Sequence, residues 1–397
     1  MQHMTSLTPA WLIDAVRTPF GKNRGALSGI RTDDLGAVPI RELLVRHPSL
    51  DPATIEDVHY GNTNGAGEEN RNVGRMAALL AGLPDTVPGV TVNRLCASGG
   101  EAFVQAAQAV AVGNGDLHIA GGVEGMSRAP YVLPKPDEGL PRSMELHQTT
   151  VGWRLVNPAF PDAWTRSLGA CAQSVAEELG IDREAMDAYA ARSHERVAAA
   201  YDRGCHDGFV VRLAGVERDE SLRVGTTAEG LAKLASAFSK GGSVTAGNAS
   251  PINDGALAAF IGSAEAVERL GVQPLGRIVG SATVGVAPDR FAIAPVPAIE
   301  KLLARTGVEA SEIALWEINE AFAAVVLACV DQAPWLPQEL LNVNGGAIAI
   351  GHPLGASAPR VVVDLCRELR RRGGGYGVAA ACIGVGLGQA ILVHVEG

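Results

Sequence analysis

The chain has 397 residues, 47% of them hydrophobic and 19% charged, which is enough for two or more domains with sizeable cores and excludes a disordered protein. A formal net charge of −10 argues against nucleic-acid binding, because no basic excess is present to neutralise phosphates. The first ten residues lack the features of a signal peptide, no apolar run approaches a membrane span, and the six cysteines have neither framework nor CxxC spacing. We therefore expect a cytoplasmic protein with reduced thiols that binds no membrane.

Strands and helices alternate through the first 122 residues. The pattern predicts strands at residues 11–16, 58–61, 91–93 and 117–120, and helices at residues 35–46, 70–81 and 101–110. This alternation is typical of α/β layers around a largely buried sheet.

The composition and the pattern of predicted elements change between residues 123 and 249. Residues 128–161 are rich in Pro, Gly and Trp, two helices are predicted at 171–179 and 183–203, and an irregular polar segment follows to residue 240. We predict that residues 123–249 form an insertion that covers something and lies outside the main sheet.

The last third repeats the order of elements of the first. After a strand at 254–261, strands are predicted at 276–284, 315–318, 378–382 and 389–395, and helices at 297–306, 320–331 and 361–372. The run Val92-Asn93 before Cys96 parallels Val343-Asn344 before His352, since each is a strand, a loop, a reactive residue and a helix. We expect two copies of one unit.

Cys96 is the candidate nucleophile. It lies between a β-branched run and an alanine-rich helix, where the helix dipole and unpaired backbone N–H groups favour a thiolate. A buried structural cysteine is the commoner fate of a free thiol. The small residues that follow, Ala97 to Gly100, would however let a substrate reach the sulfur.

Three further reactive residues lie in the last third. Asn319 separates a strand from a helix, His352 sits in a glycine-bounded loop, and Cys382 ends a strand before a turn that contains Gly384. A lone His or Cys is usually structural, and a Gly-x-Gly-x-Gly run is weak evidence for phosphate binding. Together with Cys96, however, they supply a thiol nucleophile, a base, an oriented amide and a second acid/base thiol.

The chain resembles the thiolase family nearly end to end. The matching stretches, which occur in the family's order, are residues 16–21, 92–99, 121–127, 247–250, 319–322, 351–357 and 382–388. The resemblance implies a five-layer α-β-α-β-α core made of two duplicated halves, with an inserted loop domain that binds coenzyme A. The N-terminal half would comprise residues 1–122 and 250–275, the loop domain residues 123–249, and the C-terminal half residues 276–397.

The resemblance also implies the chemistry. Cys96 would take the acyl group from a 3-oxoacyl-CoA and release acetyl-CoA, after which CoA would attack the acyl-enzyme and release a shortened acyl-CoA. His352 would activate Cys96 and, with a water held by Asn319, donate to the thioester oxygen. Cys382 would exchange the proton with the acetyl-CoA enolate or the CoA thiol, and the backbone N–H groups of Cys96 and Gly384 would form the oxyanion hole. CoA would be a cosubstrate, with no tightly bound cofactor and no metal.

Part of the insertion is similar to the family's coenzyme A segment. It implies that Arg223 lies near the nucleotide, Phe238 beside the adenine or pantetheine, and Ala246 and Ser250 along the pantetheine arm. Taken alone, Arg223 would be a solvated loop charge. The resemblance further implies a homodimer or homotetramer.

Residues 62–73 and 149–154 look most like 3-oxoadipyl-CoA thiolases of aromatic degradation. Ser167-Leu168-Gly169 stands where acetoacetyl-CoA thiolases have His-Met-Gly, and Phe291-Ala292 where a Met-Gly pair is usual. Pro359 replaces an alanine and would be tolerated only in the first turn of its helix. A dicarboxylic substrate would require a basic partner in the insertion, for which Arg154 and Arg166 are candidates. The alternatives are an acetoacetyl-CoA or medium-chain thiolase of fatty acid degradation and a non-catalytic acyl-CoA-binding subunit.

Overall fold

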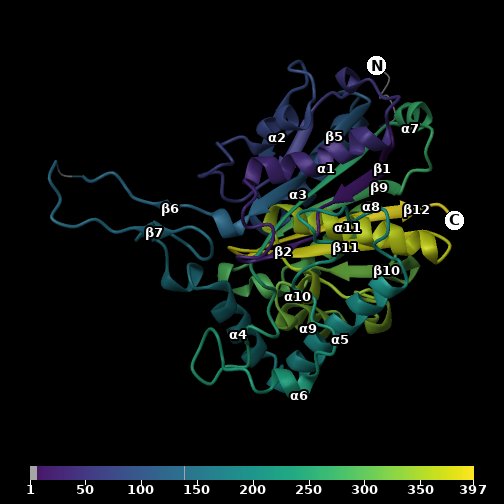
Figure 1. The fold of residues 1–397 in the computed structure, drawn as a ribbon. Coiled ribbons are helices and arrows are strands. Elements are labelled where there is room, and N and C mark those ends of the chain that lie inside the picture. Colours follow the sequence, from purple (N-terminus) through teal and green to yellow (C-terminus); the bar gives the residue numbers. More distant parts are fainter. Residues whose placement is uncertain (1–6, 138) are drawn as a thin grey trace, which may run out of the picture.

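The computed structural model describes residues 7–137 and 139–397 and is built on a ten-stranded mixed sheet (Figure 1). The order is β10-β11-β12-β9-β1-β8-β5-β3-β4, with β2 paired to β8. The strands are β1 Ala10–Arg17, β2 Gly21–Lys22, β3 Val58–Gly61, β4 Gly89–Val92, β5 Leu117–Gly125, β6 Tyr131–Val132, β7 His147–Gln148, β8 Asn253–Gly262, β9 Gly276–Gly285, β10 Ile313–Ile318, β11 Gly375–Ile383 and β12 Leu387–Val395. The helices are α1 Thr32–Arg46, α2 Val73–Ala81, α3 Ser98–Ala111, α4 Leu168–Glu178, α5 Arg183–Asp202, α6 Ala228–Leu231, α7 Ala264–Leu270, α8 Pro295–Thr306, α9 Ala323–Gln332, α10 Ala347–Ile350 and α11 Leu354–Arg371.

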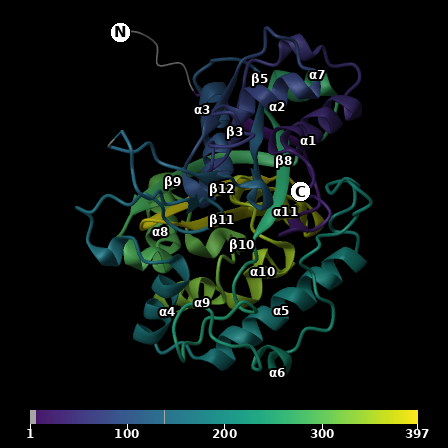
Figure 2. The same ribbon diagram turned by 60° about the vertical axis from the view of Figure 1, so that its left-hand side comes forward.

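Five layers follow from how these elements pack (Figure 2). Helices α1 and α2 cover the outer face of the β3–β5–β8 region, and α8 covers the outer face of β9 and β12. Helices α3 and α11 pack against each other and against both parts of the sheet, so they form the middle layer. Separate buried apolar clusters fill the outer N-terminal, middle and outer C-terminal spaces. The expected α-β-α-β-α core is confirmed.

The two halves share one topology. In the first half β3 pairs in parallel with β4 and β5, and β8 pairs antiparallel with β5 and β1. In the second half β10 pairs in parallel with β11 and bridges in parallel to Leu341, and β12 pairs antiparallel with β11 and β9. The bridge from Trp316 to Leu341 corresponds to the pairing of His59 with Val90. This correspondence aligns Val92-Asn93 with Val343-Asn344, as the repeated Val-Asn pair predicts.

Local chemistry explains why some helices start later or earlier than expected. The Asn72 side chain accepts the N–H of Arg75, which caps α2 at Val73 and not at residue 70. Helix α9 begins at Ala323 and not at residue 320, and a loop that starts at Asn319 separates it from β10. Helix α11 begins at Leu354, so Pro359 lies in its second turn and not in the first turn where it was expected.

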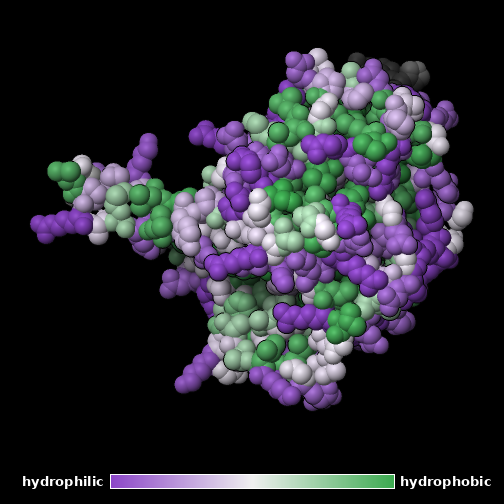
Figure 3. Space-filling model, in the orientation of Figure 1, coloured by the Kyte–Doolittle hydropathy of each residue, from purple (hydrophilic) through white to green (hydrophobic). Residues whose placement is uncertain are grey.

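The chain between β5 and β8 leaves the main sheet. Strand β5 continues to Gly125, so the first residues of segment 123–249 still belong to the main sheet, opposite β8. Strands β6 and β7 then pair at the base of a projecting arm, drawn at the left of Figure 1. The side chains Tyr131, Leu133, Leu140, Met144 and Leu146 of the arm are exposed. Green, hydrophobic patches are visible on the arm at the left of Figure 3.

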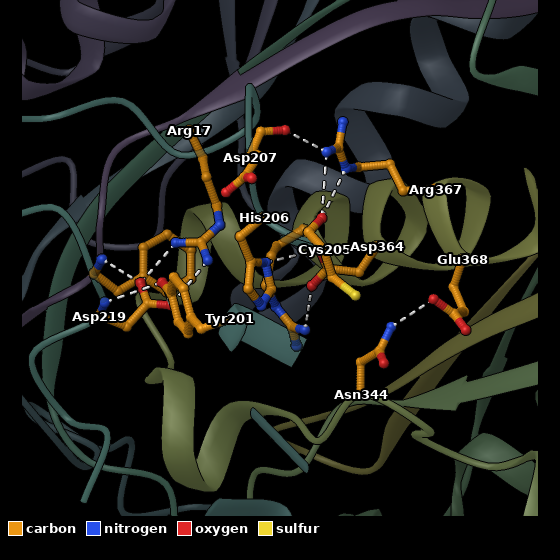
Figure 4. Close-up of polar contacts among 12 residues, drawn as sticks. Arg17, Tyr201, Cys205, His206, Asp207, Asp219, Asn344, Asp364, Arg367 and Glu368 are labelled. Carbon is orange, nitrogen blue, oxygen red and sulfur yellow. Dashed lines mark hydrogen bonds and ion pairs between the residues drawn. The ribbon is translucent and has the colours of Figure 1, made fainter. Parts of the chain in front are cut away.

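A buried polar cluster fixes the later part of this segment to both halves (Figure 4). Arg17 of β1 forms a two-pronged ion pair with Asp219, with N–O distances of 2.6 and 2.8 Å, and the Tyr201 hydroxyl donates to the same carboxylate. Arg367 of α11 donates to the backbone oxygens of Cys205 and Asp207. Because breaking a buried charged pair is costly, these contacts hold the segment over the core.

No helix within residues 7–137 and 139–397 is long and apolar enough to cross a membrane. Residues 1–6, on which the expectation of no signal peptide partly rests, lie outside the described residues.

Candidate functional site

One cavity of about 370 Å³ joins the two halves and the intervening segment. Cys96 lines it from the N-terminal half, and His352, Cys382 and Gly384 line it from the C-terminal half. The structure therefore brings together four of the five predicted catalytic residues. The fifth, Asn319, lies directly behind His352, with its Nδ2 3.5 Å from both ring nitrogens.

Cys96 lies in a short 3-10 turn, Leu95–Ala97, that leads into α3. The preceding Leu95 has a φ of +48°, a left-handed conformation that is strained for a residue with a side chain. The Ser98 hydroxyl supports this turn by donating to the Leu95 oxygen and accepting the Arg94 N–H, at 2.6 and 2.9 Å. This geometry directs the thiol of Cys96 toward the cavity.

The Cys96 thiol is neutral at rest. Burial raises its pKa to about 11, although the backbone N–H groups of Gly384 and of Cys96 itself contact the sulfur and act in the opposite direction. Burial therefore opposes the thiolate that the helix start was expected to favour. Desolvation outweighs the nearby dipoles, because a buried anion loses its hydration.

His352 is held as a neutral imidazole. Burial, and to a smaller extent Arg360, lowers its pKa to about 3. The Ser357 hydroxyl donates to the Pro353 oxygen at 2.8 Å, so its own oxygen accepts from His352 Nδ1 at 2.7 Å. We therefore assign the proton to Nδ1, which leaves Nε2 with a free lone pair. The His352 backbone N–H donates to Asn253 of β8, so the loop is held from both halves.

Asn319 and Cys382 are buried with unused chemical capacity. Asn319 Oδ1 accepts no hydrogen bond from any described residue, although the side chain is 1% exposed. Such an acceptor costs free energy unless a ligand or water supplies a donor. Burial raises the pKa of the Cys382 thiol well above 9.0, with a smaller contribution from the neighbouring Cys96, so Cys382 keeps its proton.

Glu124 is a cavity residue to which the sequence analysis gave no role. It is the penultimate residue of β5, is 2% exposed and lines the same cavity as Cys96. Its Oε2 accepts the backbone N–H groups of Thr63 and Gly355 at 3.1 and 3.0 Å, yet burial raises its pKa to about 7. The available signal was a carboxylate near the end of a strand whose other residues, His118 apart, are apolar or small.

Aromatic side chains form one wall of the cavity. Phe238 and Phe291 each meet the Phe322 ring edge to face, with centroid distances of 5.8 and 6.3 Å. Ser250 also lines the cavity, so two residues of the predicted CoA segment, Phe238 and Ser250, are cavity residues. Arg223 and Ala246 are exposed and do not line it.

The two candidate basic residues differ in position. Arg154 lines the cavity, whereas Arg166 does not and donates instead to Ser174 and the Ala170 oxygen of α4. Phe291 and Ser167, two of the residues that depart from the family pattern, also line the cavity.

Pro359 is accommodated at the crossing of the two middle helices. A Cβ added to Gly99 of α3 would lie 2.3 Å from the Gly355 oxygen and 2.7 Å from Pro359 Cγ. Gly99 therefore permits the approach of α11 and its proline ring. In the described part of the chain, no group of three or more His, Cys, Asp or Glu side chains is placed to hold a metal ion.

Comparisons with known proteins agree with this geometry. Residues 10–265 match the family model "Thiolase, N-terminal domain" and residues 272–395 match "Thiolase, C-terminal domain". The chain is 46% identical to the beta-ketoadipyl-CoA thiolase of Acinetobacter baylyi, covering 97% of this chain and 99% of that protein. It is equally identical, with the same coverage, to the 3-oxoadipyl-CoA/3-oxo-5,6-dehydrosuberyl-CoA thiolase of Escherichia coli K12.

Solved structures give the same result. Human mitochondrial 3-ketoacyl-CoA thiolase in complex with CoA superposes with a TM-score of 0.91 at 36% identity, covering 100% of both chains. The Bacillus anthracis acetyl-CoA acetyltransferase superposes with a TM-score of 0.90 at 36% identity, covering 98% of this chain and 99% of that one. With both family models matched and the fold shared over its full length, the chain belongs to the thiolase family of acyltransferases.

Proposed function

We propose that this protein cleaves 3-oxoadipyl-CoA with CoA to acetyl-CoA and succinyl-CoA. The observation that carries the proposal is the joint presence of Cys96, His352 and Cys382 on one cavity, in a chain 46% identical over nearly its whole length to beta-ketoadipyl-CoA thiolases. Identity to the acetyl-CoA acetyltransferase of Chromobacterium violaceum is lower, at 40%. The difference favours the dicarboxylic substrate over acetoacetyl-CoA.

In the first half-reaction, the Cys96 proton passes to Nε2 of His352 and the sulfur attacks the 3-oxo carbon. The bond between carbons 2 and 3 then breaks, its electron pair leaves as the acetyl-CoA enolate, and Cys382 donates the proton that completes acetyl-CoA. The neutral state of His352 and the retained proton of Cys382 support this division of roles, since a base must start unprotonated and an acid protonated.

In the second half-reaction, the CoA thiol gives its proton to the Cys382 thiolate, and its sulfur attacks the succinyl-Cys96 thioester. The bond between the succinyl carbon and the Cys96 sulfur then breaks, succinyl-CoA leaves, and the Cys96 thiolate takes back the proton held by His352. The backbone N–H groups of Cys96 and Gly384 serve as the oxyanion hole, a role supported by their contact with the Cys96 sulfur at rest. The unpaired Oδ1 of Asn319 is suited to hold a water that, with His352, faces the thioester oxygen in the first half-reaction.

The intervening segment, residues 123–249, is the proposed CoA-binding loop domain between an N-terminal half (1–122 and 250–275) and a C-terminal half (276–397). Phe238 and Ser250 would contact pantetheine in the cavity, and exposed Arg223 and Ala246 would lie along the part of CoA that remains outside. Assembly into a homodimer or homotetramer is supported by the apolar side chains exposed on the β6–β7 arm, and sedimentation of the purified protein tests it.

The decisive experiment is a substrate panel with the purified protein. Incubation with 3-oxoadipyl-CoA and CoA should release acetyl-CoA and succinyl-CoA, with a higher kcat/KM than for acetoacetyl-CoA. Mass spectrometry without added CoA should find the succinyl group on the peptide that contains Cys96.

Cys96→Ala should lower turnover by roughly 10⁴-fold or more, because the covalent route is lost. Cys171→Ala, which removes a buried thiol outside the cavity, should leave turnover within about threefold. Turnover of Cys96→Ala at the wild-type rate would refute the proposal, and a wild type without thiolysis would favour an acyl-CoA-binding subunit.

A further inference from the structure

We infer that Arg154 binds the terminal carboxylate of the acyl chain and so makes the enzyme selective for dicarboxylic 3-oxoacyl-CoA substrates. The inference rests on the proposed function and names the side chain that binds the carboxylate end of the substrate, which is distant from CoA.

The first support is where Arg154 lies. Residues 149–154, which follow β7, all line the cavity that contains Cys96. The Trp153 ring lies 3.0 Å from the position that a Cβ on Gly384 would occupy. The segment that carries Arg154 therefore packs directly on the turn whose N–H group faces the Cys96 sulfur.

The second support is charge. Among the described residues that line the cavity, Arg154 is the only Arg or Lys. Glu124 is the one carboxyl group among the described residues that line the cavity, and its Oε2 accepts the backbone N–H groups of Thr63 and Gly355. A second carboxylate in this cavity would thus find a single cationic partner.

The third support is that the guanidinium has donors to spare. Arg154 is half-buried and makes no ion pair within 4.0 Å of any carboxylate in residues 7–137 and 139–397. The one hydrogen bond that its side chain makes with the described residues is long, 3.4 Å from Nη2 to Asn64 Oδ1. Asn64 is oriented by donating to Thr149. A planar guanidinium fixed at one corner can present two parallel N–H groups to a carboxylate.

The charge could instead serve a phosphate of CoA, so the test must separate the two ends of the substrate. Arg154→Gln is compared with wild type on 3-oxoadipyl-CoA and on 3-oxohexanoyl-CoA, which has a methyl group in place of the carboxylate. Arg166→Gln is the matched control, because Arg166 comes from the same segment and lies outside the cavity.

We expect Arg154→Gln to lower kcat/KM for 3-oxoadipyl-CoA by roughly 10–100-fold, the loss typical of a hydrogen-bonded charged partner. On 3-oxohexanoyl-CoA, and in the KM for CoA, it should change the value by less than about threefold, which also shows that the variant is folded. Arg154→Lys should retain part of the selectivity, since it keeps the charge but not the fork. Arg166→Gln should match wild type on both substrates.

Equal losses on both substrates, or a raised KM for CoA alone, would overturn the inference and assign Arg154 to CoA or to folding. An unchanged variant beside an active wild type would overturn it while leaving the proposed function intact. A wild type that does not cleave 3-oxoadipyl-CoA would reject the proposed function itself, and the inference with it.

Discussion

The two halves of the molecule place corresponding residues at or beside the cavity and use them differently. Gly61 of β3 pairs with Gly122 of β5, as Ile318 of β10 pairs with Ala380 of β11. Asn62 therefore corresponds to Asn319, and Glu124 to Cys382. The N-terminal half supplies the proposed nucleophile, together with the structural Asn62 and Glu124. The C-terminal half supplies the proposed base, together with the unpaired Asn319 and the second thiol, Cys382.

Hydrogen bonding separates the structural member of each pair from the reactive one. Asn62 donates to the Val123 oxygen at 3.0 Å and accepts the Gly65 N–H at 2.9 Å, whereas Asn319 Oδ1 has no partner among the described residues. Glu124 accepts backbone N–H groups from both halves, whereas among the described residues the Cys382 sulfur is contacted by its own backbone N–H alone. A buried polar group with satisfied bonds stabilises the fold, and one left unsatisfied is available to a substrate.

The asparagine pair gives the largest expected effect. Asn319→Ala should lower kcat by roughly 10²–10³-fold, the cost of losing one donor or acceptor at the reacting oxygen. Its free energy of unfolding should change little, because the removed oxygen was unpaired. Asn62→Ala should leave the kcat of folded protein within about threefold but lower the free energy of unfolding by about 1–3 kcal/mol, because it leaves the Gly65 N–H unpaired.

Steady-state kinetics and urea denaturation of the two variants, side by side, measure both quantities. An activity loss in Asn62→Ala as large as that in Asn319→Ala would contradict the division of roles between the halves.

The sequence predicts this division only in part. The strand–loop–helix pattern singled out Cys96 and His352, which line one cavity, and the repeated Val-Asn pair aligned the two copies, because these signals are local. The protonation state of Cys96 could not be predicted, because its burial depends on elements far apart in the chain, including the Cys382 turn and the segment after β5.

Glu124 shows the same limit. Its motif was identified, but its role depends on Gly355 of α11, which comes from the other half and reaches the carboxyl only where α3 and α11 cross. The start of α11 was also missed, since Gly351 and Pro353 suggest a break in the chain and the helix nevertheless begins at Leu354. The role of Arg223 in binding the CoA nucleotide remains a prediction, because this exposed loop residue does not line the cavity.

A second, smaller effect should come from Ser357, which holds the His352 ring. Ser357→Ala removes the acceptor of Nδ1–H, so the proton can move to Nε2 and block the base. We expect kcat to fall roughly tenfold while the KM for CoA stays within about twofold. Ser174→Ala, which removes a hydroxyl bonded to the Ala170 oxygen outside the cavity, is the control.

The loss should appear in kcat measured at the pH where the wild type is most active. A raised KM with an unchanged kcat would mean that Ser357 positions substrate and not the imidazole.

The smallest effect on kcat should come from Glu124→Gln, because Glu124 has a structural role where its counterpart Cys382 has a proposed catalytic one. Burial raises the pKa of Glu124 from 4.5 to about 7, so between these values only the folded chain holds the proton and its stability falls as pH rises. Below pH 4.5 both states are protonated and nothing is lost, whereas above pH 7 the full loss, roughly 3 kcal/mol, is present. Glutamine does not titrate and escapes this loss.

Relative to wild type, Glu124→Gln should therefore become more stable as pH rises from 5 to 8, with kcat at pH 8 within about threefold of wild type. Urea denaturation at the two pH values measures the difference, and Glu396→Gln, at an exposed position, should follow wild type throughout. Parallel pH dependence of Glu124→Gln and wild type would mean that the Thr63 and Gly355 N–H groups fully offset burial, and that the carboxyl is ionised in the folded enzyme. The cavity would then carry a fixed negative charge, and the cation at Arg154 would be needed to neutralise it as well as to bind substrate.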